Sequence, residues 1–353
     1  MYSQTKNLMP LILLLSLLLP IFLGIGVHAQ TDAPKPGLTE EDWAYELAPG
    51  VTRQEVSYYS DDVECFAVVF YPPNFDRNKK TAAIVLGQGW TGTHHSIEKY
   101  AARFAEKGLV AMAIDYRGWG HSNGFATLAE RNVSRKNDET HRRESTEKVI
   151  IKRTRLLPMK QVEDYRNAIS YIQGEPGVDP ERIGLWGSSY AGGHTITVAG
   201  LDARVKAIAA QVPAISGKDS EPGPFNLRGP LLRDAIARAR TGQGGTATTG
   251  FSNPREVDRE TFEKSSEYQP FHYLQHIGQR PVLLIAAQNE QLFNNDDNAK
   301  AAIDVLTGPK KYIVVPDITH FEMYIDEAFE ISSNAAADWF VQHLGTTITD
   351  GEG

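Results

Sequence analysis

The sequence predicts an α/β protein in which a mostly parallel central sheet is flanked by helices, and two observations support this. Short runs rich in Val, Ile, Leu and Ala recur along the chain, and each is followed within a few residues by Gly, Pro, Asp or Asn. Such runs are typical of strands buried on both faces of a parallel sheet. Segments of helical periodicity lie between and after them, and this alternation predicts βαβ units that build one sheet.

The strands expected in this sheet are residues 82–86, 109–114, 183–186, 205–210, 282–287 and 312–315. The expected helices are residues 96–107, 159–173, 191–199, 298–306 and 327–344. Before the first of these elements, residues 53–71 contain the turn-like sequence Ser60-Asp61-Asp62. This predicts an antiparallel hairpin added to the edge of the sheet.

Two stretches depart from the alternation. Residues 125–157 are crowded with charge and predict a solvated loop with helical turns. Residues 216–273 combine Gly-Pro punctuation, a glycine-rich run at 242–246 and a helical middle around 231–239. They interrupt the core between two strands, so we expect a cap insertion over the active edge of the sheet.

The N-terminal residues 1–29 predict a secretory signal peptide. Lys6 precedes an almost wholly apolar run from residue 8 to residue 27. The sequence Val27-His28-Ala29 then has acceptable small residues at the two positions that determine cleavage. Cleavage after Ala29 leaves residues 30–353 as the α/β domain with its cap, in a secreted or periplasmic protein. The alternative is a retained membrane anchor, so membrane association is expected only if this segment stays on the chain.

The composition limits the possible partners and cross-links of the protein. The formal net charge of −8 argues against a general nucleic-acid binder. Cys65 is the only cysteine, so no intramolecular disulfide forms. It lies at the start of an apolar run and is expected to be a small buried residue rather than a reactive one.

A candidate nucleophile lies in residues 182–193, which predict a strand, a sharp turn and a helix. Gly187 and Ala191 stand two residues before and two after Ser189. Small residues at these positions let backbone segments cross closely, so that a serine hydroxyl projects from a strained turn at a helix N-terminus. Centring the motif on Ser188 would put bulky side chains at both positions, so the register selects Ser189.

A serine hydroxyl needs an adjacent base, and the base needs a carboxylate to orient it. His320 follows the last apolar strand and precedes the last helix, which places it at the carboxyl edge of the sheet. Glu290 follows the strand at 282–287, and the chain order serine, acid, histidine is then satisfied. The acid alternatives are Asp296, Asp297 and Asp219.

Hydrolysis also requires donors for the developing oxyanion. We expect one to be the backbone N–H of Tyr190, directly after the nucleophile. The second is expected from the glycine-rich loop at 87–92, with Trp90 favoured over Thr91. Side chains and backbone N–H groups supply the nucleophile, the base, the acid and the oxyanion donors, so no metal or organic cofactor is expected.

On these motifs the chain resembles the α/β-hydrolase superfamily over nearly all of its predicted mature length. Residues 115–124 look like the family's strand-to-loop segment, and residues 179–183 resemble its lead-in to the elbow strand. Residues 187–193 together with 319–322 look most like the dienelactone-hydrolase and X-prolyl-peptidase branches. The sequence departs from the family's pattern at Ala191, which replaces a glycine, and at Glu290, which replaces the usual Asp.

These features predict a carboxylic ester hydrolase that acts on a small-molecule ester through an acyl-enzyme on Ser189. A peptidase, acyl transferase or thioesterase using the same residues is the alternative within enzymes. A peptidase would gain from an anionic cap group that holds a substrate amine, and the candidates are Glu221, Asp234 and Glu263. The alternative outside enzymes is a non-catalytic binding protein that keeps the fold.

Overall fold

The computed structural model describes residues 38–129, 146–216, 227–249 and 255–348. These residues all belong to one of the chain's two units, Lys35–Gly353. Residues 1–29 lie outside the described ranges, so the signal peptide and export remain predictions. No helix within the described ranges is both long enough and apolar enough to cross a membrane.

The central sheet has the strand order β1-β2-β4-β3-β7-β8-β11-β12, with β13 paired to β3. Its strands are β1 Thr52–Ser60, β2 Val63–Tyr71, β3 Lys80–Gly87, β4 Val110–Ile114, β7 Val178–Ser188, β8 Val205–Gln211, β11 Val282–Ala287, β12 Lys310–Val315 and β13 Thr347–Ile348. All neighbours from β4 to β12 pair in parallel, whereas β1, β2 and β13 pair antiparallel. The predicted fold class and the hairpin at the sheet edge are therefore confirmed.

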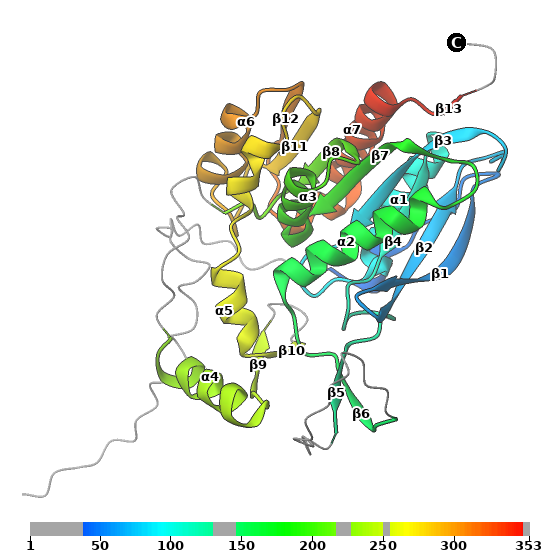
Figure 1. Cartoon of the computed structure of the whole chain (residues 1–353). Coiled ribbons are helices and arrows are strands. Elements are labelled where there is room, and N and C mark those ends of the chain that lie inside the picture. The colour runs from blue at the N-terminus through cyan, green and yellow to red at the C-terminus, as the bar shows by residue number, and fades with distance from the viewer. Residues whose placement is uncertain (1–37, 130–145, 217–226, 250–254, 349–353) are drawn as a thin grey trace, which may run out of the picture. The chain divides into compact units, whose positions relative to one another are not determined.

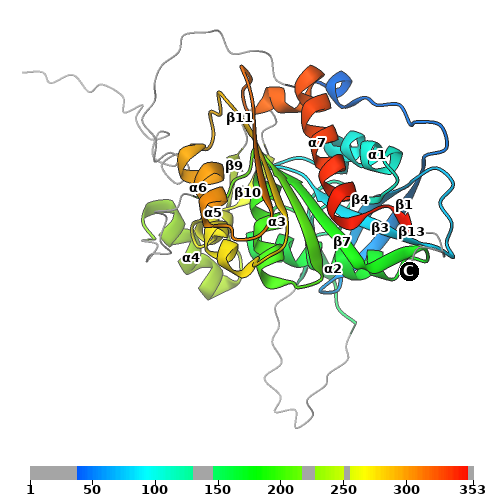
Figure 2. The ribbon, with the colours of Figure 1, turned by 90° about the horizontal axis from the view of Figure 1, so that it is seen from above.

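Helices cover both faces of the sheet (Figures 1 and 2). They are α1 Glu98–Glu106, α2 Pro158–Gln173, α3 Tyr190–Leu201, α6 Ala301–Val305 and α7 Asp326–Leu344. Alternate strand residues divide between two hydrophobic clusters, as the two-residue period of a strand requires. Leu185 packs with α2 and α3 on one face, and its neighbour Trp186 packs with α1 and α7 on the other.

The stretch at 125–157 differs from its prediction. Strands β5 Phe125–Leu128 and β6 Val149–Lys152 form an antiparallel hairpin, and no helical turn precedes α2 in the described part of this stretch. Residues 130–145 lie outside the described ranges. The prediction of a loop rested on the many charged residues and overlooked the β-branched run Val-Ile-Ile at 149–151, whose residues favour an extended backbone.

Between β8 and β11 lies the cap segment, which we define as residues 227–249 and 255–276. Its elements are α4 Gly229–Thr241, β9 Thr246–Thr249, β10 Arg255–Asp258, α5 Glu260–Ser266 and η3 Pro270–His276. The backbone N–H of Asp258 donates to the carbonyl of Thr154 at 2.7 Å, and Arg155 pairs with Glu260 at 2.8 Å. The insertion is therefore tied to the segment that precedes α2. Its role as a cap remains a prediction.

Candidate active site

Ser189 occupies the sharp turn between β7 and α3. Its φ of 57° and ψ of −119° are unusual for a residue with a side chain. The turn closes tightly, because a Cβ on Gly187 would lie 2.4 Å from the carbonyl oxygen of Ala191. The predicted elbow geometry is present, and the strained turn places the Ser189 hydroxyl at the N-terminal end of α3.

The structure brings Ser189, His320 and Glu290 together. The Ser189 hydroxyl lies 3.0 Å from His320 Nε2, and His320 Nδ1 lies 2.9 and 3.0 Å from the two carboxylate oxygens of Glu290. A proton on Nδ1 donated to the carboxylate leaves Nε2 free to accept the serine proton. His320 is 1% exposed and Ser189 is 7% exposed, so the pair is largely shielded from water.

The carboxyl ends of neighbouring parallel strands position the acid and the base. Glu290 follows β11 and His320 follows β12, and these strands pair directly. The loops are joined by a hydrogen bond from the N–H of Asn289 to the carbonyl of Ile318 at 2.9 Å. Glu290 Oε1 also accepts the N–H of Leu292 at 2.8 Å. The carboxylate is thus held in place by the backbone of its own loop.

The alternative acids do not reach His320 within the described residues. Asp296 pairs with Lys300 at 3.1 Å on the surface. Asp297 has no hydrogen bond or ion pair to the His320 ring, and Asp219 lies outside the described ranges. Glu290 is therefore the carboxylate that orients the ring, despite being one methylene longer than Asp.

The loop expected to supply an oxyanion donor lies against the nucleophile. A Cβ on Gly89 would approach the Ser189 Cβ to 3.0 Å, so glycine permits this close approach. The next residue, Trp90, packs its ring edge-on against Tyr190 with 5.2 Å between ring centroids. Donation by the backbone N–H groups of Trp90 and Tyr190 remains a prediction, and both residues lie beside Ser189 as it requires.

Ser188 faces a different environment. Its hydroxyl lies 2.7 Å from the Tyr324 hydroxyl and accepts from Gln211 Nε2 at 3.3 Å. Gln211 Nε2 also donates to Tyr100 at 3.0 Å. The structure thus places Ser189, and not Ser188, within hydrogen-bond distance of His320. Tyr324 was not predicted from the sequence, where its only signal is its position four residues after His320.

A second buried histidine, His194, lies one turn into α3. Its Nδ1 is 2.7 Å from the Tyr268 hydroxyl and its Nε2 is 3.1 Å from Gln161 Oε1. The amide oxygen can only accept, so Nε2 carries the proton and Nδ1 accepts from Tyr268. Burial lowers the pKa of His194 to about 3, which keeps the ring neutral.

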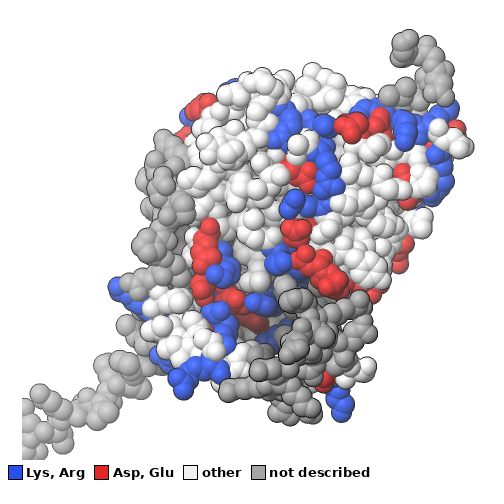
Figure 3. Space-filling view, in the orientation of Figure 1, with Lys and Arg blue, Asp and Glu red and all other residues white. Residues whose placement is uncertain are grey.

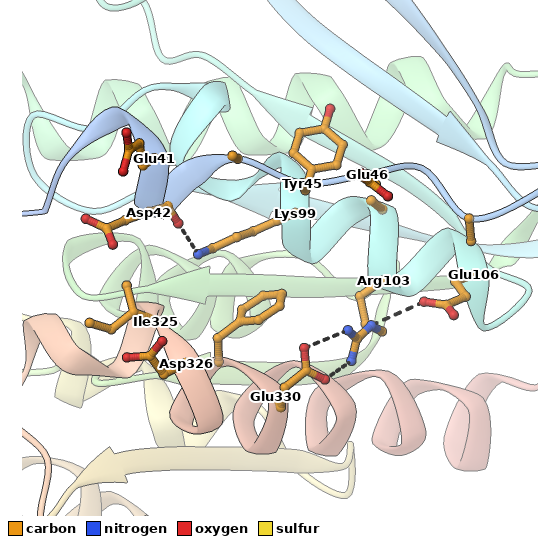
Figure 4. A pocket seen from close by; sticks show the side chains of 14 residues that line it. Glu41, Asp42, Tyr45, Glu46, Lys99, Arg103, Glu106, Ile325, Asp326 and Glu330 are labelled. Atoms are coloured by element: carbon orange, nitrogen blue, oxygen red, sulfur yellow. Dashed lines mark hydrogen bonds and ion pairs between the residues drawn. The ribbon is translucent and has the colours of Figure 1, made fainter.

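A hollow of about 520 Å³ lies between residues 41–48, α1 and α7 (Figure 4). None of Ser189, Glu290 and His320 lines it. Arg103 within it pairs with Glu330 at 2.8 Å, and Lys99 donates to the carbonyl of Asp42 at 2.6 Å. Burial lowers the pKa of Lys99 to about 8. The two cationic side chains of this hollow are therefore already bound by neighbouring protein groups. The arrangement suited to catalysis is the one at Ser189.

Two further expectations concern residues away from the triad. Cys65 is fully buried, and burial raises the pKa of its thiol to about 12, as expected for an unreactive residue. Among the candidate cap acids, Asp234 and Glu263 both pair with Arg238, at 2.9 and 2.5 Å, and Glu221 lies outside the described ranges. No group of three or more metal-ligating side chains occurs in the part of the chain that the structure describes.

Residues 45–218, just under half of the chain, match the family model of acetyl xylan esterase. A hypothetical protein from Pseudomonas aeruginosa has a similar structure, with a TM-score of 0.67 and 20% identity, over 88% of this chain and 100% of that one. The chain belongs to the α/β-hydrolase superfamily. The finer likeness of this α/β-hydrolase to the dienelactone-hydrolase and X-prolyl-peptidase branches remains a prediction.

Curated relatives of this α/β-hydrolase match over most of their length. An uncharacterised 31.7 kDa protein of Escherichia coli is 26% identical, over 80% of this chain and 97% of that protein. The quorum-quenching protein AidA of Acinetobacter baumannii is 25% identical, over 78% and 90%. The thiohydrolase aneE of Aspergillus aculeatus is 22% identical, over 70% and 81%. The esterase family model and the contacts of Ser189 with His320 and Glu290 together support a serine hydrolase.

Proposed function

We propose that this serine hydrolase cleaves carboxylic esters of small molecules through an acyl-enzyme on Ser189. The observation that carries the proposal is the unbroken hydrogen-bonded chain from the Ser189 hydroxyl through His320 to Glu290. The match of residues 45–218 to an esterase family supports esters over amides. The pairing of Asp234 and Glu263 with Arg238 disfavours a peptidase that would need a free cap carboxylate for a substrate amine.

In the first half-reaction, Ser189 Oγ attacks the acyl carbon while His320 Nε2 takes its proton. Glu290 stabilises the imidazolium, and the N–H groups of Trp90 and Tyr190 donate to the oxyanion. The ester C–O bond then breaks as His320 returns the proton to the departing alcohol. In the second half-reaction, His320 takes a proton from water, the resulting hydroxide equivalent attacks the acyl carbon, and Ser189 leaves with that proton.

A thioester could be opened by the same half-reactions with a thiol as the leaving group. The similarity to a thiohydrolase of Aspergillus aculeatus favours this as the second candidate. Rates on matched oxygen and sulfur esters of one acyl group would rank the two. Either outcome uses the same acyl-enzyme on Ser189.

A fluorophosphonate probe tests the proposal, because it modifies only a serine that a neighbouring base activates. We expect labelling of the wild type at Ser189, and none of Ser189→Ala, whose hydrolysis of 4-nitrophenyl acetate should fall by at least about 10³-fold. The matched control is Ser188→Ala, which should still be labelled. A folded wild-type protein that resists the probe would refute a serine hydrolase at this site.

A further inference from the structure

We propose that Arg255 of the cap segment binds a carboxylate on the substrate, so that the preferred esters are those of acids or alcohols carrying a second, ionised carboxyl group. This inference rests on the proposed ester hydrolysis and names the substrate class of the same site. It follows from where Arg255 lies, how it is held, and what surrounds its charge.

Arg255 stands at the end of a row of aromatic rings that begins beside the nucleophile. Tyr190, the residue after Ser189, packs against Trp90 at 5.2 Å between ring centroids. Trp90 packs edge-on against Trp119 at 6.0 Å. The guanidinium carbon of Arg255 lies 5.2 Å from the centroid of the Trp119 ring. The rings thus connect the site of bond cleavage with a positive charge supplied by the cap segment.

The backbone around Arg255 is anchored rather than loose. Arg255 opens β10, where it pairs with Thr249 of β9. At the other end of this short strand, Asp258 accepts the Thr154 hydroxyl at 2.5 Å and donates its N–H to the Thr154 carbonyl at 2.7 Å. The guanidinium is therefore presented over Trp119 by a fixed element, which lowers the entropic cost of using it to bind a ligand.

The charge of Arg255 has no carboxylate partner among the residues that the structure describes, although the side chain is partly buried. Burial lowers its pKa, the nearby charge of Arg153 lowers it further, and Asp115 acts in the opposite direction. The Asp115 carboxylate is itself engaged, by His94 Nδ1 at 2.8 Å and by the N–H of His121 at 2.8 Å. Arg153 donates to a neutral acceptor, the carbonyl of Gly120. Among the described residues, neither Arg255 nor Arg153 therefore has an ion pair with a carboxylate.

Arg238 shows how protein carboxylates can balance an arginine charge in the cap segment. Arg238 in the same cap segment pairs with Asp234, Glu260 and Glu263 at 2.9, 3.3 and 2.5 Å. Figure 3 shows acidic and basic side chains side by side over the region of α5. Arg255, which is also partly buried, differs from Arg238 in that it forms no ion pair with a carboxylate among the described residues. A planar fork of donors that lacks its carboxylate matches a carboxylate ligand in geometry as well as charge.

Two pairs of esters test the proposal and show which side of the ester carries the charge. The first pair is 4-nitrophenyl hydrogen adipate and 4-nitrophenyl hexanoate, which differ by a carboxylate on the acyl group. The second is 4-acetoxybenzoate and its methyl ester, which differ by a carboxylate on the leaving group. We expect the wild type to favour the charged member of one pair by about tenfold or more in kcat/KM.

The variant Arg255→Met should lower kcat/KM for that charged ester by about 10- to 100-fold, mainly through KM, because a charge-assisted contact to bound substrate is lost. It should leave the neutral partner within about twofold. Arg255→Lys should restore part of the preference, and Arg240→Met, which removes an exposed arginine of α4, should change neither rate. Circular dichroism would verify that each variant is folded.

Equal rates on both members of both pairs would overturn the role of Arg255 while leaving ester hydrolysis intact. An equal loss on charged and neutral esters in Arg255→Met would overturn it as well, since that result indicates a structural role. If the wild type hydrolyses none of the four esters and resists the fluorophosphonate probe, the proposed function itself fails, and this inference fails with it.

Discussion

The loop that carries His320 and the helix that carries His194 each bury an imidazole near the nucleophile, with 1% and 0% of the residue exposed. The difference lies in what faces the two ring nitrogens. His320 has a carboxylate at Nδ1 and the Ser189 hydroxyl at Nε2. His194 has a tyrosine hydroxyl at Nδ1 and an amide oxygen at Nε2.

Burial alone therefore does not make a histidine a base. A protonated ring in a buried site needs a negative charge beside it, and the neutral partners of His194 supply none, so burial lowers its pKa to about 3. The Glu290 carboxylate supplies that charge to His320 at the moment it accepts the serine proton. Three substitutions test this difference between the two histidines.

Glu290→Gln gives His320 a neutral partner like that of His194, and it should have the largest effect. The amide oxygen can still accept the N–H of Leu292, so the loop should keep its shape. The amide cannot balance the imidazolium charge, and we expect kcat to fall by about 10³- to 10⁴-fold on 4-nitrophenyl acetate.

The matched control is Asp296→Asn, in the same loop region but paired only with Lys300 at 3.1 Å. Its kcat should stay within about twofold of the wild type. A large loss in Asp296→Asn and a small one in Glu290→Gln would contradict the geometry and move the acid to Asp296.

His194→Gln tests the neutral state of the buried His194 ring through the pH dependence of stability. The unfolded chain takes up a proton near pH 6.5, whereas the folded ring resists protonation until about pH 3. A lowered folded pKa contributes stability that is fully present above the unfolded value and is lost progressively as pH falls toward the folded value. At pH 5 the loss from this one ring should be about 2 kcal/mol relative to pH 7.

Urea unfolding of wild type and His194→Gln at pH 7 and pH 5 isolates this contribution, because the other titrating groups are common to both proteins. The variant should be less stable at pH 7, and its stability should fall by about 2 kcal/mol less on going to pH 5. Equal falls in the two proteins would show that His194 already titrates normally in the folded state.

The sequence predicted the triad because its members depend on local order and on topology. Ser189 stands in a motif whose glycine and alanine are required by backbone contacts such as that between Gly187 and Ala191. Glu290 and His320 each follow a buried run, and the carboxyl ends of parallel strands meet at one edge of a sheet. Knowing the strands placed the serine, the histidine and the candidate acids at one edge, but it left Asp296 and Asp297 open beside Glu290, and the contact of Glu290 with His320 comes from the structure.

The sequence could not predict contacts that depend on how distant segments pack. Tyr268 lies 74 residues from His194, and no periodicity connects the cap segment to α3. The same holds for Arg255 over Trp119, because both the β9-β10 hairpin and its anchor at Thr154 come from tertiary structure. At 149–151 the signal was local and was overlooked: the β-branched run predicts a strand, but the many charged residues around it led to the prediction of a loop.

Tyr268→Phe should give the smallest effect of the three, and it tests whether the neutral environment of His194 acts as a unit. The hydroxyl bonds His194 at 2.7 Å and Thr197 at 2.9 Å, so removing it leaves a buried ring nitrogen without its donor. We expect a loss of about 1 kcal/mol in unfolding free energy. Ester hydrolysis should stay within a fewfold of wild type, since Tyr268 bonds neither Ser189 nor His320 among the described contacts.

Tyr59→Phe, at a tyrosine 69% exposed, is the control and should leave stability unchanged. Combined with His194→Gln, the loss from Tyr268→Phe should shrink, because the nitrogen it would leave unsatisfied is already gone; strictly additive losses would show that the two residues act separately.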